Sequence, residues 1–100
     1  MKVIIQSVQF TAAQPLLDYT EKKVGKLKQY FDRITDAEVY LTLDNKSSHI
    51  KDKTAKIKIN LPGEQIIAAE TNKVFEEAID AAVESLKKQI ERYKDKIRLR

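Results

Sequence analysis

Apolar and polar residues alternate along several stretches of the chain. Val39 and Leu41 are separated by one residue of opposite character, and so are Ile57 and Ile59. Alternation with a period of two is typical of a strand that buries one face and exposes the other. Together with two further apolar runs, this pattern predicts four strands, at residues 2–9, 36–43, 54–61 and 65–70.

Two other stretches have apolar residues at steps of three and four, which predicts amphipathic helices. The first helix is expected from about residue 13 to 31, with Leu17, Thr20, Val24, Leu27 and Phe31 on its apolar face. The second carries Phe75, Ile79, Ala82, Leu86, Ile90, Tyr93 and Ile97. Thr11 is the expected N-cap region of the first helix, Pro15 fits its first turn, and Thr71 or Asn72 is expected to cap the second. Gly25 weakens a helix, so we expect it to allow a close packing contact.

The elements therefore follow the order β-α-β-β-β-α, which predicts an α+β fold in a single domain spanning residues 1–100. A helical crossover joins the first two strands, so these should pair in parallel. The polar stretch 44–52 and the turn Pro62-Gly63-Glu64 connect the other strands into an antiparallel meander. Each strand has one apolar face and each helix one apolar stripe, so we expect both helices on one face of a four-stranded mixed sheet. The lysines of the first helix and the basic end of the second would then merge into one patch.

Positive charge is concentrated at the end of the second helix. Residues 84–100 contain seven Lys or Arg and three acids, and their charge of +4 equals the formal charge of the whole chain. The acids Glu76, Glu77 and Asp80 lie near the helix start, so part of this distribution matches the helix dipole. Seven cations exceed that need, and a basic face of this kind is typical of proteins that bind phosphate backbones.

Catalytic chemistry has little support in the sequence. There is no cysteine, the one histidine is His49 in a polar stretch, and no residues have the spacing of metal ligands. We therefore expect no enzyme activity, no cofactor, no metal site and no small-molecule substrate. The absence of cysteine and of any long apolar run favours a cytoplasmic protein that does not enter membranes.

The four tyrosines are candidates for stacking on nucleotide bases. Tyr30 and Tyr93 fit the edge of the core, whereas Tyr40, on the polar side of its strand, is expected to be the most exposed. The aromatic signature of RNA-recognition-motif strands is missing, so recognition through Lys and Arg on the helices is favoured, with little reading of base identity.

Two segments resemble a known family. Lys26-Leu-Lys-Gln-Tyr-Phe-Asp-Arg-Ile34 is similar to the exit of the first helix in the ribosome hibernation-promoting factors, also called ribosome-associated inhibitors or sigma-54 modulation proteins. The second segment resembles the second helix of that family. It consists of Ala78-Ile-Asp80, Leu86, Gln89 and Tyr93-Lys-Asp-Lys96. The resemblance extends over essentially the whole chain.

The resemblance implies a fold like that of double-stranded-RNA-binding domains with an extra first strand. It also implies binding to the 30S subunit and the 70S ribosome, against 16S rRNA in the channel of mRNA and of the A- and P-site tRNAs, which silences and preserves idle ribosomes. The family's basic positions correspond to Lys23, Lys26, Lys88, Arg92, Lys94, Lys96 and Arg98. Lys22, Lys28 and Lys87 join the expected rRNA-binding set on charge alone.

The chain also departs from the family pattern. Glu76 and Glu77 replace a frequent Tyr-Ala pair, and Ser7 replaces a frequent glycine. Acids at the helix start repel phosphate, so we expect the second helix to bind through its C-terminal half. Without the second, dimerising domain of long relatives, the chain resembles a short form and is expected to be monomeric off the ribosome. Two alternatives stay open, a general double-stranded-RNA-binding module and a protein-interaction domain that modulates a transcription factor.

Overall fold

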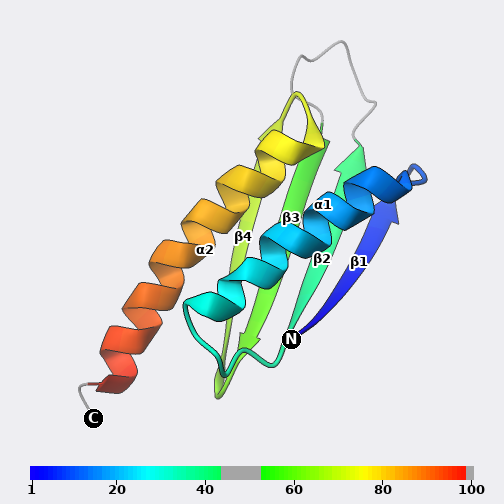
Figure 1. The fold of residues 1–100 in the computed structure, drawn as a ribbon. Coiled ribbons are helices and arrows are strands. Elements are labelled where there is room, and N and C mark those ends of the chain that lie inside the picture. Colours follow the sequence, from blue (N-terminus) through cyan, green and yellow to red (C-terminus); the bar gives the residue numbers. More distant parts are fainter. Residues whose placement is uncertain (44–52, 99–100) are drawn as a thin grey trace.

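The computed structural model describes residues 1–43 and 53–98, which form a sheet layer and a helix layer (Figure 1). In chain order the elements are β1 (Lys2–Val8), α1 (Gln14–Gly25), the 3₁₀ helix η1 (Lys26–Gln29), β2 (Asp36–Leu43), β3 (Lys53–Leu61), β4 (Glu64–Asn72) and α2 (Phe75–Arg98). β1 pairs with β2 in parallel, and β2, β3 and β4 pair antiparallel in that order. The expected order and the mixed sheet are confirmed. The stretch 44–52, with His49, lies outside the described residues.

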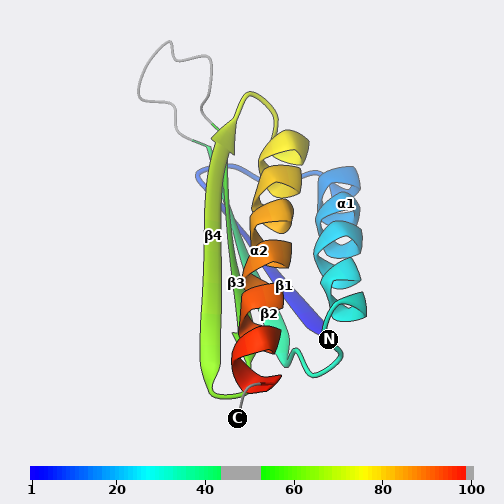
Figure 2. The ribbon, with the colours of Figure 1, turned by 90° about the vertical axis from the view of Figure 1, so that its left-hand side faces the viewer.

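The two faces of the sheet have different surroundings. On one face, Val39 of β2 lies opposite Ile57 of β3, and both side chains are buried. Both helices cover this face and leave the other open, as Figure 2 shows. On the open face, the amide of Asn60 donates hydrogen bonds to the carboxylates of Asp36 and Glu38. The alternation in the sequence therefore divides the sheet as expected, with one apolar face and one polar face.

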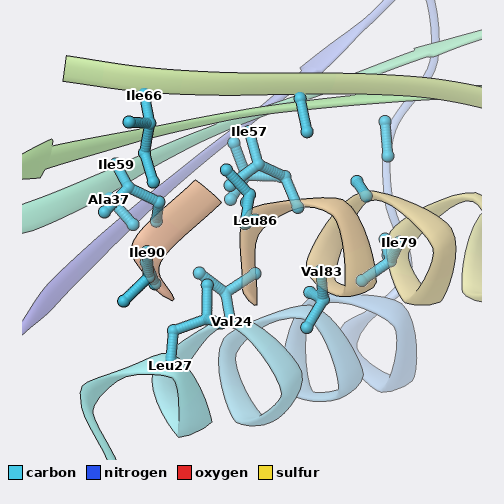
Figure 3. Close-up of a cluster of buried hydrophobic side chains, with 14 of the residues drawn as sticks. Val24, Leu27, Ala37, Ile57, Ile59, Ile66, Ile79, Val83, Leu86 and Ile90 are labelled. Atoms are coloured by element: carbon cyan, nitrogen blue, oxygen red, sulfur yellow. The ribbon is translucent and has the colours of Figure 1, made fainter. Parts of the chain in front are cut away.

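The core lies between the sheet and the two helices. Leu86 and Ile90 of α2 are fully buried, as are Val24 of α1 and Ile57 of β3, and their side chains meet in this layer (Figure 3). Removing a side chain of this size from water contributes about 1.5–3 kcal/mol. The stripe of apolar residues along α2 thus fixes the helix against the sheet and determines which of its residues face solvent.

Two hydrogen bonds tie α2 to β4 and its turn. The amide of Gln89 donates to the backbone oxygen of Ile67 at 3.0 Å, and the hydroxyl of Tyr93 donates to the backbone oxygen of Pro62 at 2.9 Å. Tyr93 is buried, which confirms its expected place at the core edge. The tight turn is confirmed as well, because Leu61 pairs with Glu64 across it and Gly63 has a φ of +76°, as the third position of a type II turn requires.

The first helix begins at Gln14, within one residue of the expected start, but its cap and its end differ from those expected. The α-helical part ends at Gly25 and continues as η1, so the regular helix is shorter than the predicted span of about 13–31. Its N-cap is Ala13, not Thr11, and no side chain caps it, although Pro15 lies in the first turn as expected. The predicted cap of the second helix is also wrong, because Thr71 and Asn72 both belong to β4. Caps depend on local backbone geometry that apolar spacing does not encode.

The close packing contact expected at Gly25 is absent. A methyl group added at this position would have no atom within 4 Å outside its immediate chain neighbours, and the backbone there has an ordinary helical φ of −61°. We therefore expect Gly25→Ala to raise the free energy of unfolding by about 0.4–1 kcal/mol, because alanine restricts the unfolded chain. Chemical denaturation measures this change. The control is Gly63→Ala, which should destabilise the fold because of its positive φ. A loss of stability in Gly25→Ala would contradict the expectation.

Candidate nucleic-acid interface

α1 and α2 lie side by side and run in the same direction, so their basic C-terminal ends lie toward the same end of the molecule (Figures 1 and 2). The last turn of α1 carries Lys22 and Lys23, and the last turn of α2 carries Lys96 and Arg98. The negative ends of the two helix dipoles also lie there, and each favours nearby cations. Some of the charge therefore stabilises the helices, and the remainder is available to a partner.

A groove separates the two helices, and we call it the interhelical groove. It has a volume of about 620 Å³, and it is lined by Lys23, Lys26, Leu27, Gln29 and Tyr30 from the first helical segment and by Asp80, Val83, Glu84 and Lys87 from α2. Three of the ten cations expected from the sequence, Lys23, Lys26 and Lys87, are thus brought together. This part of the expected merged patch exists.

Acids inside the groove hold two of these lysines. The ammonium of Lys87 lies 2.7 Å from the carboxylate of Glu84, and that of Lys23 lies 3.5 Å from Asp80. The hydrogen bond between Lys87 and Glu84 lowers the pKa of the carboxyl and raises the pKa of the ammonium. The Lys87 ammonium also lies 5.4 Å from the centre of the Tyr30 ring. Both lysines therefore have defined positions in the groove.

Three candidate cations further along α2 are also paired with acids. The pairs are Lys94 with Glu91 at 3.4 Å, Lys96 with Glu64 of β4 at 3.0 Å, and Arg98 with Asp95 at 3.7 Å. Exposed pairs of this kind contribute at most about 1 kcal/mol. A phosphate can therefore replace the acid at little cost in stability.

The other five candidates make no ion pair with an acid in the part of the chain that the structure describes. They are Lys22, Lys26, Lys28, Lys88 and Arg92. Lys22 lines the outer side of α1, whereas Arg92 lies on the β4 side of α2, beside Lys96. The ten cations therefore lie on more than one side of the helices, and their merging into a single patch stays a prediction.

Tyr30 and Tyr40 differ from their expected exposure. Tyr30 was expected at the core edge, but it is 37% exposed, and it directly follows Gln29, the last residue of η1. Tyr40, expected to be the most exposed, is only half-buried on the open sheet face. Its hydroxyl donates to Glu38 at 3.0 Å, and the Lys58 ammonium lies 5.4 Å from its ring centre. Tyr30 is therefore the better candidate for contact with a base.

Sequence reasoning missed the acids and amides of the groove. Asp80 lies within a motif of the apparent family, but its partners come from α1, far away in the chain. Gln29 lies within the segment 26–34 that resembles the family, and Glu84 lies three residues before Lys87, but neither pattern predicts a groove. The pair Glu84 and Lys87 forms within α2, but only the packing of the helices places it beside Lys23, so no local pattern could have predicted the groove.

The hydroxyl of Tyr19 donates to Asp80 at 2.6 Å, and this hydrogen bond is the main reason that the pKa of Tyr19 rises to about 12. An unfolded tyrosine has a pKa of about 10. The bond therefore stabilises the fold fully below about pH 10, and this contribution is lost as pH rises from about 10 to about 12. The difference in free energy of unfolding between wild type and Tyr19→Phe should shrink across this window. Denaturation at a series of pH values measures it, and a constant difference would contradict the assignment.

The part of the chain that the structure describes holds neither a cluster of metal-binding side chains nor a helix that could span a membrane. Among residues 1–43 and 53–98, no three or more His, Cys, Asp or Glu side chains are grouped so that they could hold a metal ion. Within the same ranges, no helix combines the length and apolar content that crossing a membrane requires.

Comparison with known proteins identifies relatives over nearly the whole chain. Residues 3–98 match the family model described as Sigma 54 modulation protein / S30EA ribosomal protein. A ribosome hibernation promotion factor of Deinococcus radiodurans is 33% identical over 81 residues, which are 81% of this chain and 42% of that protein. The chain thus spans less than half of this relative. A ribosome hibernation promoting factor of Escherichia coli K12 is 33% identical over 92 residues, which are 92% of this chain and 90% of the relative.

Solved structures share the same arrangement. The N-terminal domain of Thermus thermophilus Protein Y is 30% identical with a TM-score of 0.77, and the match covers 93% of this chain and 99% of that one. A ribosomal subunit interface protein from Coxiella burnetii has a TM-score of 0.83 at 21% identity, covering 95% and 99% of the two chains. The second similarity supports the fold alone.

Proposed function

Because this chain belongs to the Sigma 54 modulation protein / S30EA ribosomal protein family, we propose that it is a ribosome hibernation factor. Relatives named ribosome hibernation promoting factors match most of its length, which supports this role. In the proposed mechanism it acts without enzymatic chemistry in the cytoplasm. It binds the small ribosomal subunit in the channel of mRNA and of the A- and P-site tRNAs, and it thereby silences and preserves idle ribosomes.

The charge on the helices carries the proposed binding mode. Lys88 and Arg92 extend from the C-terminal half of α2 and make no ion pair within the described residues, so no acid must be displaced before they meet a phosphate. Glu76 and Glu77 are exposed in the first turn of α2 and would repel the same phosphate. We therefore propose that 16S rRNA contacts the C-terminal half of α2 and the end of α1, through the ten cations expected from the sequence.

The affinity for ribosomes should depend strongly on salt. If each of the five cations without an acid partner holds one phosphate, a plot of log affinity against log salt has a slope of about −3.5 to −4.5, because each contact contributes about −0.7 to −0.9. The paired lysines would steepen this slope if they exchange their acids for phosphate. Affinities measured by filter binding or light scattering at several salt concentrations give the slope. A slope near zero would exclude binding through phosphates.

Sedimentation of the protein with purified 30S subunits and 70S ribosomes on sucrose gradients tests the proposed function. Stoichiometric binding that mRNA and tRNA compete away supports occupancy of the channel, and a 100S peak would add the pairing of ribosomes. Binding to short RNA duplexes but not to ribosomes would instead support a general double-stranded-RNA-binding module. Absence of binding to both ribosomes and short RNA duplexes would favour the protein-interaction role that the sigma-54 label of the family suggests.

A further inference from the structure

The interhelical groove combines features of a ligand pocket with those of a phosphate-binding surface. Its volume of about 620 Å³ falls within the range of about 300–1,000 Å³ that is typical of small-ligand pockets. Its wall includes the apolar side chains of Leu27 of η1 and Val83 of α2, both buried, which Figure 3 shows in the layer between the helices. The space can therefore take a flat, partly apolar group.

Tyr30 offers such a group a stacking surface. Its side chain is 37% exposed although the residue lines the groove, and the ammonium of Lys87 lies 5.4 Å from its ring centre. Lys87 is itself held by Glu84 at 2.7 Å. An aromatic ring that is both exposed and positioned in this way is suited to stack on an unpaired nucleobase, because every base presents a π face.

The charges of the groove are mixed. Lys23, Lys26 and Lys87 supply three positive charges, and Asp80 and Glu84 supply two negative charges, which leaves +1. A surface that only attracts phosphate needs no acids. A carboxylate has about four acceptor positions, so Glu84 can accept a further hydrogen bond from an amino group while it holds Lys87. Lys26, which has no acid partner among the described residues, is placed to meet a phosphate.

We propose that the interhelical groove binds one unpaired nucleotide of RNA. Its base stacks on Tyr30, the amino group of the base donates a hydrogen bond to the carboxylate of Glu84, and its phosphate is held by Lys26. The inference rests on the proposed function, since it names the part of the RNA that this groove would recognise. A hydrogen bond from an amino group to Glu84 favours cytosine over uracil, because uracil carries an oxygen in place of that amino group. The groove thus adds some base preference to binding that otherwise depends on phosphates.

Titration with cytidine and uridine monophosphates, followed by NMR, tests the pocket without ribosomes. We expect cytidine monophosphate to shift signals of Tyr30 and Lys87 and to bind about 5-fold or more tightly than uridine monophosphate, as expected for one discriminating contact. Glu84→Gln should lower this preference, because its amide can also donate to uracil. Absence of shifts in the groove, or an equal response to both nucleotides, would overturn the proposal.

Ribosome binding by Tyr30 variants separates this inference from the proposed function. Tyr30→Ala should lower affinity by about 5- to 150-fold, the range for loss of one stacked base, whereas Tyr30→Phe should retain it. Tyr40→Ala, on the open sheet face, is the matched control, and thermal melts verify that each variant folds. Unchanged affinity in Tyr30→Ala would overturn the pocket and leave hibernation intact. Binding of cytidine monophosphate by a protein that fails to bind ribosomes would support the pocket while removing the proposed function.

Discussion

Reversal of charge at Lys88 and Arg92 together is expected to lower the affinity for ribosomes by about 10²- to 10⁴-fold. Each is proposed to make one charge-assisted hydrogen bond to a phosphate, worth about 1.5–3 kcal/mol, and each glutamate would repel that phosphate. The slope of log affinity against log salt should also become shallower by about 1.4–1.8, since two phosphate contacts are lost. Sedimentation and filter binding of Lys88→Glu/Arg92→Glu at several salt concentrations measure both effects.

The matched control for this variant changes the net charge by the same amount elsewhere. Lys56→Glu/Lys73→Glu alters one exposed lysine on the open sheet face and one just before α2. We expect this control to bind ribosomes with an affinity within a few-fold of wild type. Both variants should unfold within about 0.5 kcal/mol of wild type per substitution, as is usual for exposed residues. Equal loss of binding in the two variants would indicate a response to net charge alone and would contradict the proposed interface.

Truncation of Leu86 to alanine is expected to have the largest effect on stability. Leu86 lies in the middle of α2, fully buried against the sheet and close to Val24 and Ile57 (Figure 3). Removal of its methyl groups should lower the free energy of unfolding by about 2–5 kcal/mol, through lost burial and the cavity that remains. The free energy of unfolding of an ordinary domain is about 5–15 kcal/mol, so this substitution would remove a large fraction of the stability. Urea denaturation at 25 °C measures the change.

Ile67→Ala is the control for the buried site. Ile67 is 43% exposed on the open sheet face, and the hydrogen bond that it accepts from Gln89 uses its backbone oxygen, which the substitution leaves in place. Truncation of the Ile67 side chain should lower the free energy of unfolding by about 1 kcal/mol or less. Similar effects of the two substitutions would mean that α2 is not seated on the sheet as described.

The fold could be predicted from the sequence because burial follows simple periods. Val39 and Ile57 mark the inward face of their strands by alternation, and Leu86 marks the inward face of α2 by steps of three and four. The strand bounds were correct to within two residues. The change of winding after Gly25 and the uncapped start at Ala13 could not be predicted in this way, since both depend on local backbone geometry rather than on which side chains are apolar.

The candidate site was predictable only in part. The sequence identified the cations, because their density along α2 exceeds what the helix dipole requires. Ion pairs between residues three apart on α2, such as Lys94 with Glu91, follow from sequence spacing. The sequence could not show that Glu64 on β4 holds Lys96, or that Lys23 and Tyr19 of another helix share Asp80. Such contacts form between elements that are distant in the chain, and they exist only after the helices and the sheet have packed.

The parallel pairing of β1 with β2 has a consequence for the order in which the chain can fold during its own synthesis. Lys2 is paired with Asp36, with all of α1 between them, whereas Leu61 is paired with Glu64 across a tight turn. The hairpin of β3 and β4 therefore closes a short loop, and β1 closes a much longer one, with a larger entropic cost. A chain made from its N-terminus produces β1 first, yet this strand has no partner until β2 follows. β1 is therefore made before its partner and stays unpaired until β2 has been added.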